Sequence, residues 1–182
     1  VNDYYPGVLL ERRAARLLAA CITEIRGGGE IVPVSGWRSQ EEQQRIWEDT
    51  LRESGAAFTR QYVALPGCSE HQTGLAIDLG KRKDEIDFIR PDFPYSGLCQ
   101  TFRKAALRYG FIERYGRDKE RLTGISHDPW HFRYVGAPHA RIMHANKLCL
   151  EEYTEVVKER ENDCVLENVR FARELYVPGE GE

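Results

Sequence analysis

Four side chains in two short segments of the sequence could together perform hydrolysis. The first segment contains His71 and Asp78, and the second contains Asp128 and His131. Two imidazole nitrogens and one carboxylate oxygen are the ligand set of a catalytic zinc ion that keeps a fourth position for water. We therefore expect His71, Asp78 and His131 to bind Zn2+. Asp128 lies three residues before His131, close enough to act as the base that takes a proton from the water.

Two predicted strands must bring these residues together. Residues 75–79 are apolar apart from Asp78 and are typical of a short buried strand, in which the acid has to be compensated. A glycine just before this strand allows a turn, so that His71 can fold back toward Asp78. Residues 130–135 form a second β-rich run that places His131 on one face and aromatic side chains on the other.

Each of these residues also has a purely structural interpretation. A histidine in an aromatic strand is commonly a core residue, and an aspartate after a glycine commonly forms a turn. Three of the five histidines, however, lie in the two segments beside acids, and this combination favours metal binding. An alternating strand would point His127 away from Asp128, toward packing or the surface. His139 and His144 are five residues apart, which does not match a helical metal pair, and we expect both at the surface.

The composition is that of an ordinary globular protein. The 182 residues are 41% hydrophobic and 30% charged, enough for one domain with a real core, and we expect this domain at residues 1–160 with an extension or linker at 161–182. A formal net charge of −3 gives no electrostatic case for nucleic acid or an anionic membrane as partner. No apolar run approaches the ~18 residues that span a bilayer.

The cysteines favour a reducing compartment. There are five, an odd number without a CxxC pair, and Cys21 and Cys99 fall in helical patterns where buried thiols are expected. We therefore expect a cytoplasmic protein. Because the chain begins at Val1, a membrane-anchored extracellular domain whose N-terminal anchor has been removed stays an alternative. Cys68 lies near His71 but has no second soft ligand at short spacing, so we expect it to be structural.

Periodicity and turn signals predict the remaining elements. Ser39 and Glu42 form a capping box that begins a helix, which Gly55 would end, and Pro33 places its strand near a sheet edge. The expected elements are a helix over 8–26, a strand over 31–34, a semi-extended segment over 58–65, a polar loop over 81–97, a helix over 98–109, a strand over 111–115, a helical region over 138–159 and a weak alternating pattern over 165–177.

The two motifs resemble those of the VanY, VanX and VanXY zinc D,D-peptidases. These motifs are Ser-x-His-x-x-Gly-x-Ala-x-Asp at residues 69–78 and Pro-Trp-His-Phe-Arg-Tyr-Val-Gly at residues 129–136, and the likeness extends to Ser-Gly-Trp-Arg-Ser at residues 35–39. Those peptidases belong to the LAS metallopeptidases, named for lysostaphin, D-Ala-D-Ala peptidases and sonic hedgehog. The resemblance implies an α+β fold, with a small central antiparallel sheet flanked by helices.

The resemblance also implies an activity and residue roles. The implied reaction is zinc-dependent removal of the terminal D-Ala from the D-Ala-D-Ala dipeptide or from a peptidoglycan-precursor pentapeptide, with vancomycin resistance as the biology. His71, Asp78 and His131 would be the zinc ligands. Arg38 would face the scissile carbonyl, and Ser69 would contact the terminus of the substrate.

One position departs from the family pattern. The family places a glutamate three residues before the second zinc histidine, where this chain has Asp128. Its side chain is one methylene shorter, which leaves it about 1 Å short of the water, and a misplacement of that size can cost ~100-fold in rate. Three explanations stay open: a natural working base, an engineered replacement that traps substrate or product, and a binding protein that keeps zinc without turnover.

Two other functions therefore remain as alternatives. One is a LAS-type endopeptidase that cuts within cell-wall peptides, and the other is a non-catalytic zinc-bearing module that binds D-Ala-D-Ala. The sequence also leaves open the preference between dipeptide and pentapeptide, which would depend on how a loop such as 81–97, or the region after Gly116, caps the cleft.

Overall fold

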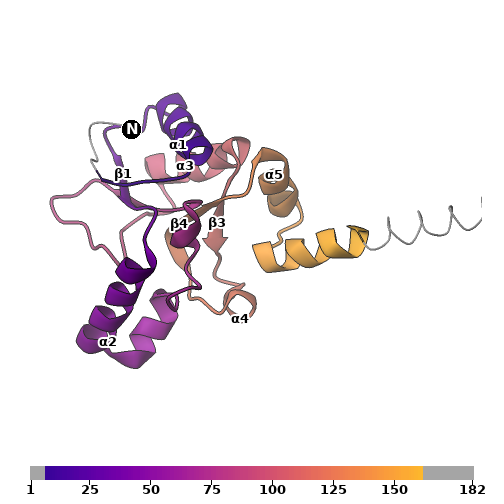
Figure 1. Cartoon of the computed structure of the whole chain (residues 1–182). Coiled ribbons are helices and arrows are strands. Elements are labelled where there is room, and N and C mark those ends of the chain that lie inside the picture. The colour runs from indigo at the N-terminus through magenta and orange to yellow at the C-terminus, as the bar shows by residue number, and fades with distance from the viewer. Residues whose placement is uncertain (1–6, 162–182) are drawn as a thin grey trace, which may run out of the picture. The chain divides into compact units, whose positions relative to one another are not determined.

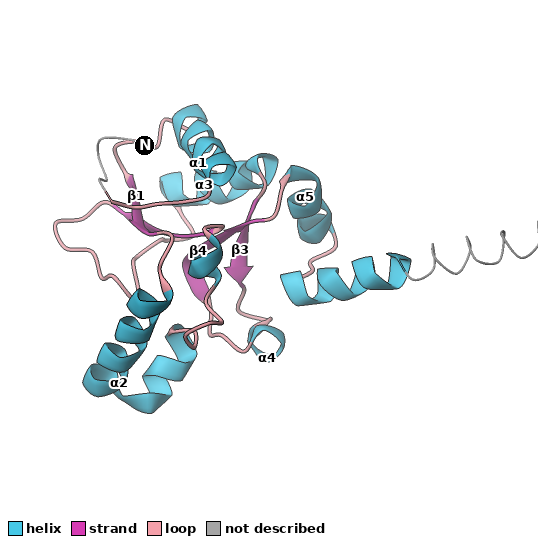
Figure 2. Cartoon of the chain, viewed as in Figure 1, coloured by secondary structure: helices cyan, strands magenta, loops and turns pink. Residues whose placement is uncertain are grey.

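A four-stranded antiparallel sheet lies at the centre of the computed structural model, which describes residues 7–161 (Figure 1). The strands are β1 (Ile31–Ser35), β2 (Ala76–Lys81), β3 (Phe111–Tyr115) and β4 (Asp128–Tyr134), in the order β1-β2-β4-β3. The helices are α1 (Arg12–Glu24), α2 (Gln40–Tyr62), α3 (Gly97–Ala106), α4 (Glu120–Thr123) and α5 (Ala137–Ala145), with 3-10 helices at Glu70–Thr73 and Leu107–Tyr109 (Figure 2). The predicted α+β fold with a central antiparallel sheet is confirmed.

The sheet separates the apolar core from the polar residues of the two motifs. Ile77 of β2 pairs with Phe132 of β4, and both pack into the core with the buried faces of α1 and α3. Asp78 and His131 pair one step along the same ladder. Because side chains alternate along a strand, this pair points to the opposite face. Figure 1 shows α1 and α3 together on one side of the sheet.

The segment before α1 ties two loops of the polar face to each other. The helix begins at Arg12, four residues later than predicted, because the residues ahead of it form tertiary hydrogen bonds. Leu9 O accepts from the backbone N–H of Trp37 (2.6 Å), and the N–H of Glu11 donates to Gly74 O (2.8 Å). The Glu11 carboxylate then caps the helix by accepting two of its first backbone N–H groups.

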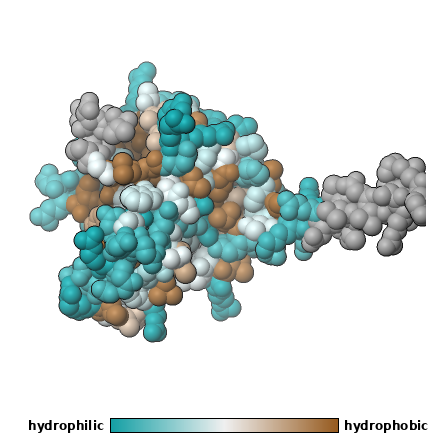
Figure 3. Space-filling view, in the orientation of Figure 1, coloured by the Kyte–Doolittle hydropathy of each residue, from teal (hydrophilic) through white to brown (hydrophobic). Residues whose placement is uncertain are grey.

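The helix predicted to end at Gly55 continues to Tyr62, so the semi-extended segment expected from residue 58 is wrong. Gly55 has a φ of 79° and kinks the helix without ending it. The helix resumes because Thr59 Oγ1 donates to Gly55 O (2.9 Å) and the rings of Phe58 and Tyr62 pack 4.8 Å apart. The capping box at Ser39 is confirmed. Over α2 the molecular surface is mainly hydrophilic (Figure 3).

The helical region predicted over residues 138–159 is also interrupted. Helix α5 ends at Ala145, and helical structure begins again at residue 150. Lys147 between them has a φ of 55°, which is incompatible with a continuous right-handed helix. The chain divides into two compact units, one up to Cys149 and one from Leu150. The domain boundary expected at residue 160 stays a prediction, and the pattern at 165–177 lies outside the described residues.

Gly110 joins α3 and its 3-10 extension to β3, at a point where two backbone segments almost touch. Its φ is 85°, and a Cβ there would lie 2.8 Å from the backbone of Gly136. Its carbonyl accepts from the backbone N–H groups of Val135 and Gly136. A side chain would therefore be strained by its conformation and would also push β3 away from the chain after β4.

We expect Gly110→Ala to lower the free energy of unfolding by about 3 kcal/mol, measured by urea denaturation. Gly124→Ala is the matched control, because Gly124 also has a left-handed φ of 73° but open space around it. That variant should lose only about 1 kcal/mol. Equal losses in the two variants would show that the close approach to Gly136 contributes nothing.

Candidate metal centre and active site

The structure brings His71, Asp78 and His131 into one buried cluster. His71 comes from the 3-10 helix before β2, Asp78 from β2 itself and His131 from the neighbouring β4. His71 Nε2 lies 3.1 Å from Asp78 Oδ2, and His131 Nδ1 lies 2.9 Å from Asp78 Oδ1. One ligand atom from each residue lies within 4.8 Å of the others. Ligand atoms 2.0–2.1 Å from a tetrahedral zinc ion would be about 3.3 Å apart, so the spacing fits such an ion.

The outward-facing nitrogen of each histidine is held by an acceptor. His71 Nδ1 donates to the carbonyl of Gly36 (2.7 Å), since a carbonyl can only accept. His131 Nε2 faces the Glu70 carboxylate at 3.4 Å. Such contacts fix the ring orientation and leave the other nitrogen for a metal. Both histidines therefore direct their remaining nitrogen at Asp78.

The protonation states of the three side chains in this cluster suit the binding of a cation. Burial lowers the pKa of His71, so its Nε2 carries a lone pair that faces an oxygen of Asp78. Burial opposes ionisation of Asp78, but His71 and His131 outweigh it and hold the pKa of that carboxyl well below its usual range. Burial also opposes protonation of His131, yet hydrogen bonds to Asp78 and Glu70 raise its pKa to about 9. At the contact with His71 an ionised carboxylate therefore faces an imidazole lone pair, and a divalent metal ion bound between them would relieve this unfavourable contact.

Arg38 lies beside the cluster and is held on three sides. Its Nε donates to Ser35 Oγ (2.8 Å), its Nη1 to Gln43 Oε1 (3.3 Å) and its Nη2 to Asp78 Oδ2 (3.2 Å). Gln43 is completely buried in α2 and also donates to the carbonyl of Ala64 (2.8 Å). The guanidinium is therefore placed at the metal cluster by the end of β1 and by α2.

A strand irregularity turns Asp128 toward the cluster. The register of β3 and β4 shifts between Glu113 and Tyr115. Glu113 forms an ion pair with Arg103 of α3 on the core side, whereas the ring of Tyr115, two residues on, packs against His131. The alternation of side chains between the two faces of the sheet is broken there, as at a β-bulge. Tyr115 and its partner Asp128 therefore both line the metal cluster.

Asp128 is buried and poorly solvated. It is 4% exposed, and its Oδ1 has no hydrogen-bond partner among the described residues. Burial raises the pKa of this carboxyl to about 8. A divalent cation nearby would favour the ionised form, which a general base needs.

An inner pocket with a free volume of about 40 Å³ surrounds these groups. It is lined in part by Arg38, Ser69, His71, Asp78, Asp128 and His131. This volume accommodates an ion and one or two water molecules, but a dipeptide would require a lining side chain to move. Phe88 also lines this pocket, is 47% exposed, and has its ring 5.4 Å from the Arg38 guanidinium.

The six residues singled out from the sequence thus all line one pocket. Ser69 is at the N-terminus of the 3-10 helix, where its side chain makes no capping hydrogen bond. Sequence reasoning missed Glu70 and Gln43, which orient His131 and Arg38. The only signal for Glu70 was its place next to His71, and a glutamine on a polar helix gives none. Cys21 and Cys99 are buried thiols, and His139 and His144 are exposed, as predicted.

His127 makes its contacts outside the metal cluster, in agreement with the packing or surface role predicted for it. Its ring stacks on Tyr95 with an interplanar angle of 13°, and its Nε2 lies 2.6 Å from the Tyr95 hydroxyl. Cys68 is exposed and is not among the residues that could hold the metal.

A small antiparallel sheet with a His-Asp-His cluster on its polar face defines a metallopeptidase of the LAS type. A family model described as VanY, D-alanyl-D-alanine carboxypeptidase, matches residues 8–137, and the chain belongs to this family. The resemblance predicted from the two motifs is confirmed.

Two curated relatives are similar over most of this chain. The bifunctional D-Ala-D-Ala dipeptidase and D-Ala-D-Ala carboxypeptidase VanXYC of Enterococcus gallinarum is 51% identical over 127 residues, covering 69% of this chain and 67% of the relative. A D-alanyl-D-alanine carboxypeptidase of Enterococcus faecalis is 37% identical over 139 residues, covering 70% and 48%. The chain thus spans about two thirds of the first relative and about half of the second.

Solved structures of D,D-peptidases are also similar to this chain. The vancomycin resistance D,D-dipeptidase VanXYg, in complex with a D-Ala-D-Ala phosphinate analogue, is 57% identical with a TM-score of 0.86, covering 87% of this chain and 63% of that one. A mutant of the D,D-pentapeptidase VanY in complex with Zn(II) is 33% identical with a TM-score of 0.68, covering 82% and 85%. None of the helices within residues 7–161 is long and apolar enough to cross a bilayer.

The raised pKa of Asp128 predicts a pH dependence of stability in the metal-free protein. Between about pH 4 and pH 8 the folded state keeps a proton that the unfolded state has released, so stability falls as the pH rises. Relative to wild type, Asp128→Asn should therefore gain up to about 1.4 kcal/mol per pH unit in this window. Urea denaturation from pH 4.5 to 7.5 with a chelator measures the gain. The control Asp118→Asn makes the same change at an exposed position and should not reproduce this gain.

Proposed function

We propose that this chain is a zinc-dependent D,D-peptidase that removes the terminal D-Ala from D-Ala-D-Ala or from a peptidoglycan precursor that ends in it. The observation that carries the proposal is the cluster of His71, Asp78 and His131, in which both histidines present one nitrogen to the carboxylate while the other is held. Family membership and the substrates named for VanXYC and VanXYg support it. Vancomycin resistance is the biology that we infer.

In this proposal His71, Asp78 and His131 hold Zn2+. When bound, the ion polarises the scissile carbonyl and lowers the pKa of a coordinated water molecule. Asp128 accepts a proton from the attacking water at Oδ1, the buried oxygen without a partner, and returns it to the leaving amine of D-Ala. Arg38 stabilises the negative charge that develops on the carbonyl oxygen.

Ser69 and the compartment complete the proposal. We infer that the Ser69 hydroxyl binds the terminal carboxylate of the substrate, which its place in the lining of the inner pocket and its lack of a capping bond support. We infer a cytoplasmic protein, which the unpaired Cys21 and Cys99 thiols support. Residues 1–160 would form the peptidase domain and 161–182 an extension.

Zinc affinity should depend on Glu70, because its carboxylate orients His131. We expect Glu70→Gln to weaken zinc binding by about 10- to 100-fold, measured by competition with a chromophoric chelator. The same change at an exposed acid, Glu53→Gln, should leave the affinity at the wild-type value. An unchanged affinity in Glu70→Gln would contradict the proposed role of this carboxylate.

The rate of D-Ala release should depend on the length of the side chain at position 128. We expect the zinc-loaded chain to release D-Ala slowly, and Asp128→Glu to raise kcat by up to ~100-fold because the longer side chain reaches the attacking water. Asp128→Asn should be inactive. The control Asp118→Glu lengthens an exposed acid equally and should not change kcat. D-Ala release from the dipeptide and from a pentapeptide is the measurement.

Two results would replace this proposal. If zinc-loaded wild type and Asp128→Glu both release no D-Ala but bind D-Ala-D-Ala, the chain is a binding module. If they cut muropeptides internally without releasing D-Ala, it is a cell-wall endopeptidase.

A further inference from the structure

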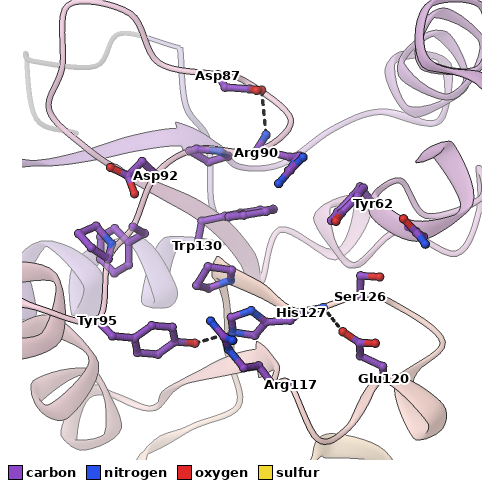
Figure 4. A pocket seen from close by; sticks show the side chains of 15 residues that line it. Tyr62, Asp87, Arg90, Asp92, Tyr95, Arg117, Glu120, Ser126, His127 and Trp130 are labelled. Carbon is purple, nitrogen blue, oxygen red and sulfur yellow. Dashed lines mark hydrogen bonds between the residues drawn. The ribbon is translucent and has the colours of Figure 1, made fainter.

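A second, larger pocket adjoins the inner pocket. This outer pocket has a volume of about 880 Å³ and is lined in part by Tyr62, Arg90, Arg117, Glu120, His127 and Trp130 (Figure 4). Tyr62 and Trp130 also line the inner pocket, so the two pockets share a wall. The outer pocket is thus the adjacent space for the residues that precede a peptide terminus held at the metal cluster.

The acidic side chains of the outer pocket are already engaged. Asp87 Oδ1 accepts hydrogen bonds from two backbone N–H groups of its own loop (2.8 and 2.9 Å). Asp92 forms an ion pair with Lys83 (2.5 Å). Glu120 Oε1 accepts from the backbone N–H of His127 (3.0 Å). Each of these carboxylates thus has a local partner.

The two arginines of the outer pocket, by contrast, are not paired with a carboxylate among the described residues. Within residues 7–161, neither Arg90 nor Arg117 forms an ion pair with a carboxylate, and both side chains are exposed. The Arg90 guanidinium is kept in place by the Tyr62 ring, 4.9 Å away. Figure 4 shows Arg90 and Arg117 on opposite sides of Trp130 in that view. Guanidinium groups bind carboxylates well because two parallel N–H donors match two oxygens.

The remaining wall is aromatic and rigid. The stacked rings of Tyr95 and His127 are joined by the contact between the Tyr95 hydroxyl and His127 Nε2. Arg103 lies over the Tyr95 ring at 3.9 Å and donates to the backbone carbonyl of Pro129 (2.7 Å). This wall is attached through Pro129 to the strand that carries Asp128 and His131.

We propose that the outer pocket binds the part of a longer peptide that precedes its D-Ala-D-Ala terminus, and that Arg90 and Arg117 select peptides with a carboxylate there. The inference rests on the proposed function and adds to it a preference among long substrates. A free dipeptide has no residues that could reach this pocket, so its hydrolysis is the internal reference for each variant.

Matched peptides test the proposal. Two peptides ending in D-Ala-D-Ala should differ only in a preceding residue, glutamate in one and glutamine in the other. With the zinc-loaded full chain, we expect kcat/KM to be roughly tenfold higher for the glutamate peptide. In the double variant Arg90→Gln, Arg117→Gln this ratio should fall to about one. The control Arg121→Gln removes an exposed arginine outside the pocket and should keep the wild-type ratio.

Equal kcat/KM values for the two peptides in wild type, or a ratio that survives in the double variant, would overturn the proposal while leaving D-Ala release intact. If no peptide is hydrolysed, calorimetric binding of both peptides to the zinc-loaded chain gives the answer. Tighter binding of the glutamate peptide that is lost in the double variant supports the outer pocket even though the peptidase function has failed. Equal binding overturns it.

Discussion

The buried carboxylate of Asp78 is the constraint on which the rest of the polar face depends. An ionised group at 5% exposure is very costly unless it is compensated. Arg38 and His131 compensate it, and His71 presents its remaining nitrogen to the same carboxylate, so that groups from three different segments meet there. The same requirement that keeps the fold stable thus assembles the groups needed for hydrolysis.

The sheet makes this arrangement compatible with a stable core. Pairing of β2 with β4 puts Ile77 against Phe132 on one face and Asp78 against His131 on the other. Burying the apolar face under α1 and α3 contributes stability without involving the polar residues. The irregular end of β4 adds what alternation alone would not provide, because it turns Asp128 to the ligand face.

The sequence predicted the cluster well because its signals are local. A carboxylate in an apolar strand and histidines beside acids are visible in short windows, and strand periodicity then assigns faces. Gly55 and Lys147 show where such reasoning fails. A glycine signals a break but cannot reveal that the helix restarts beyond it, where Thr59 donates back to the carbonyl of Gly55, and nothing local marks Lys147 as left-handed. Glu70 was missed for a related reason, since its partner His131 lies 61 residues away, whereas Gln43 was missed because a glutamine on a polar helix gives no signal.

The short segment ahead of α1 has a consequence for where this domain can be cut. Through backbone hydrogen bonds, Leu9 and Glu11 connect the loop that precedes Arg38 to the turn that follows His71. A shortened protein that starts at the first helix would keep every ligand, yet it would lose the packing of Val8 and Leu10 against the core and the bonds that hold these two loops in register. The functional boundary of the domain therefore lies upstream of its first regular element.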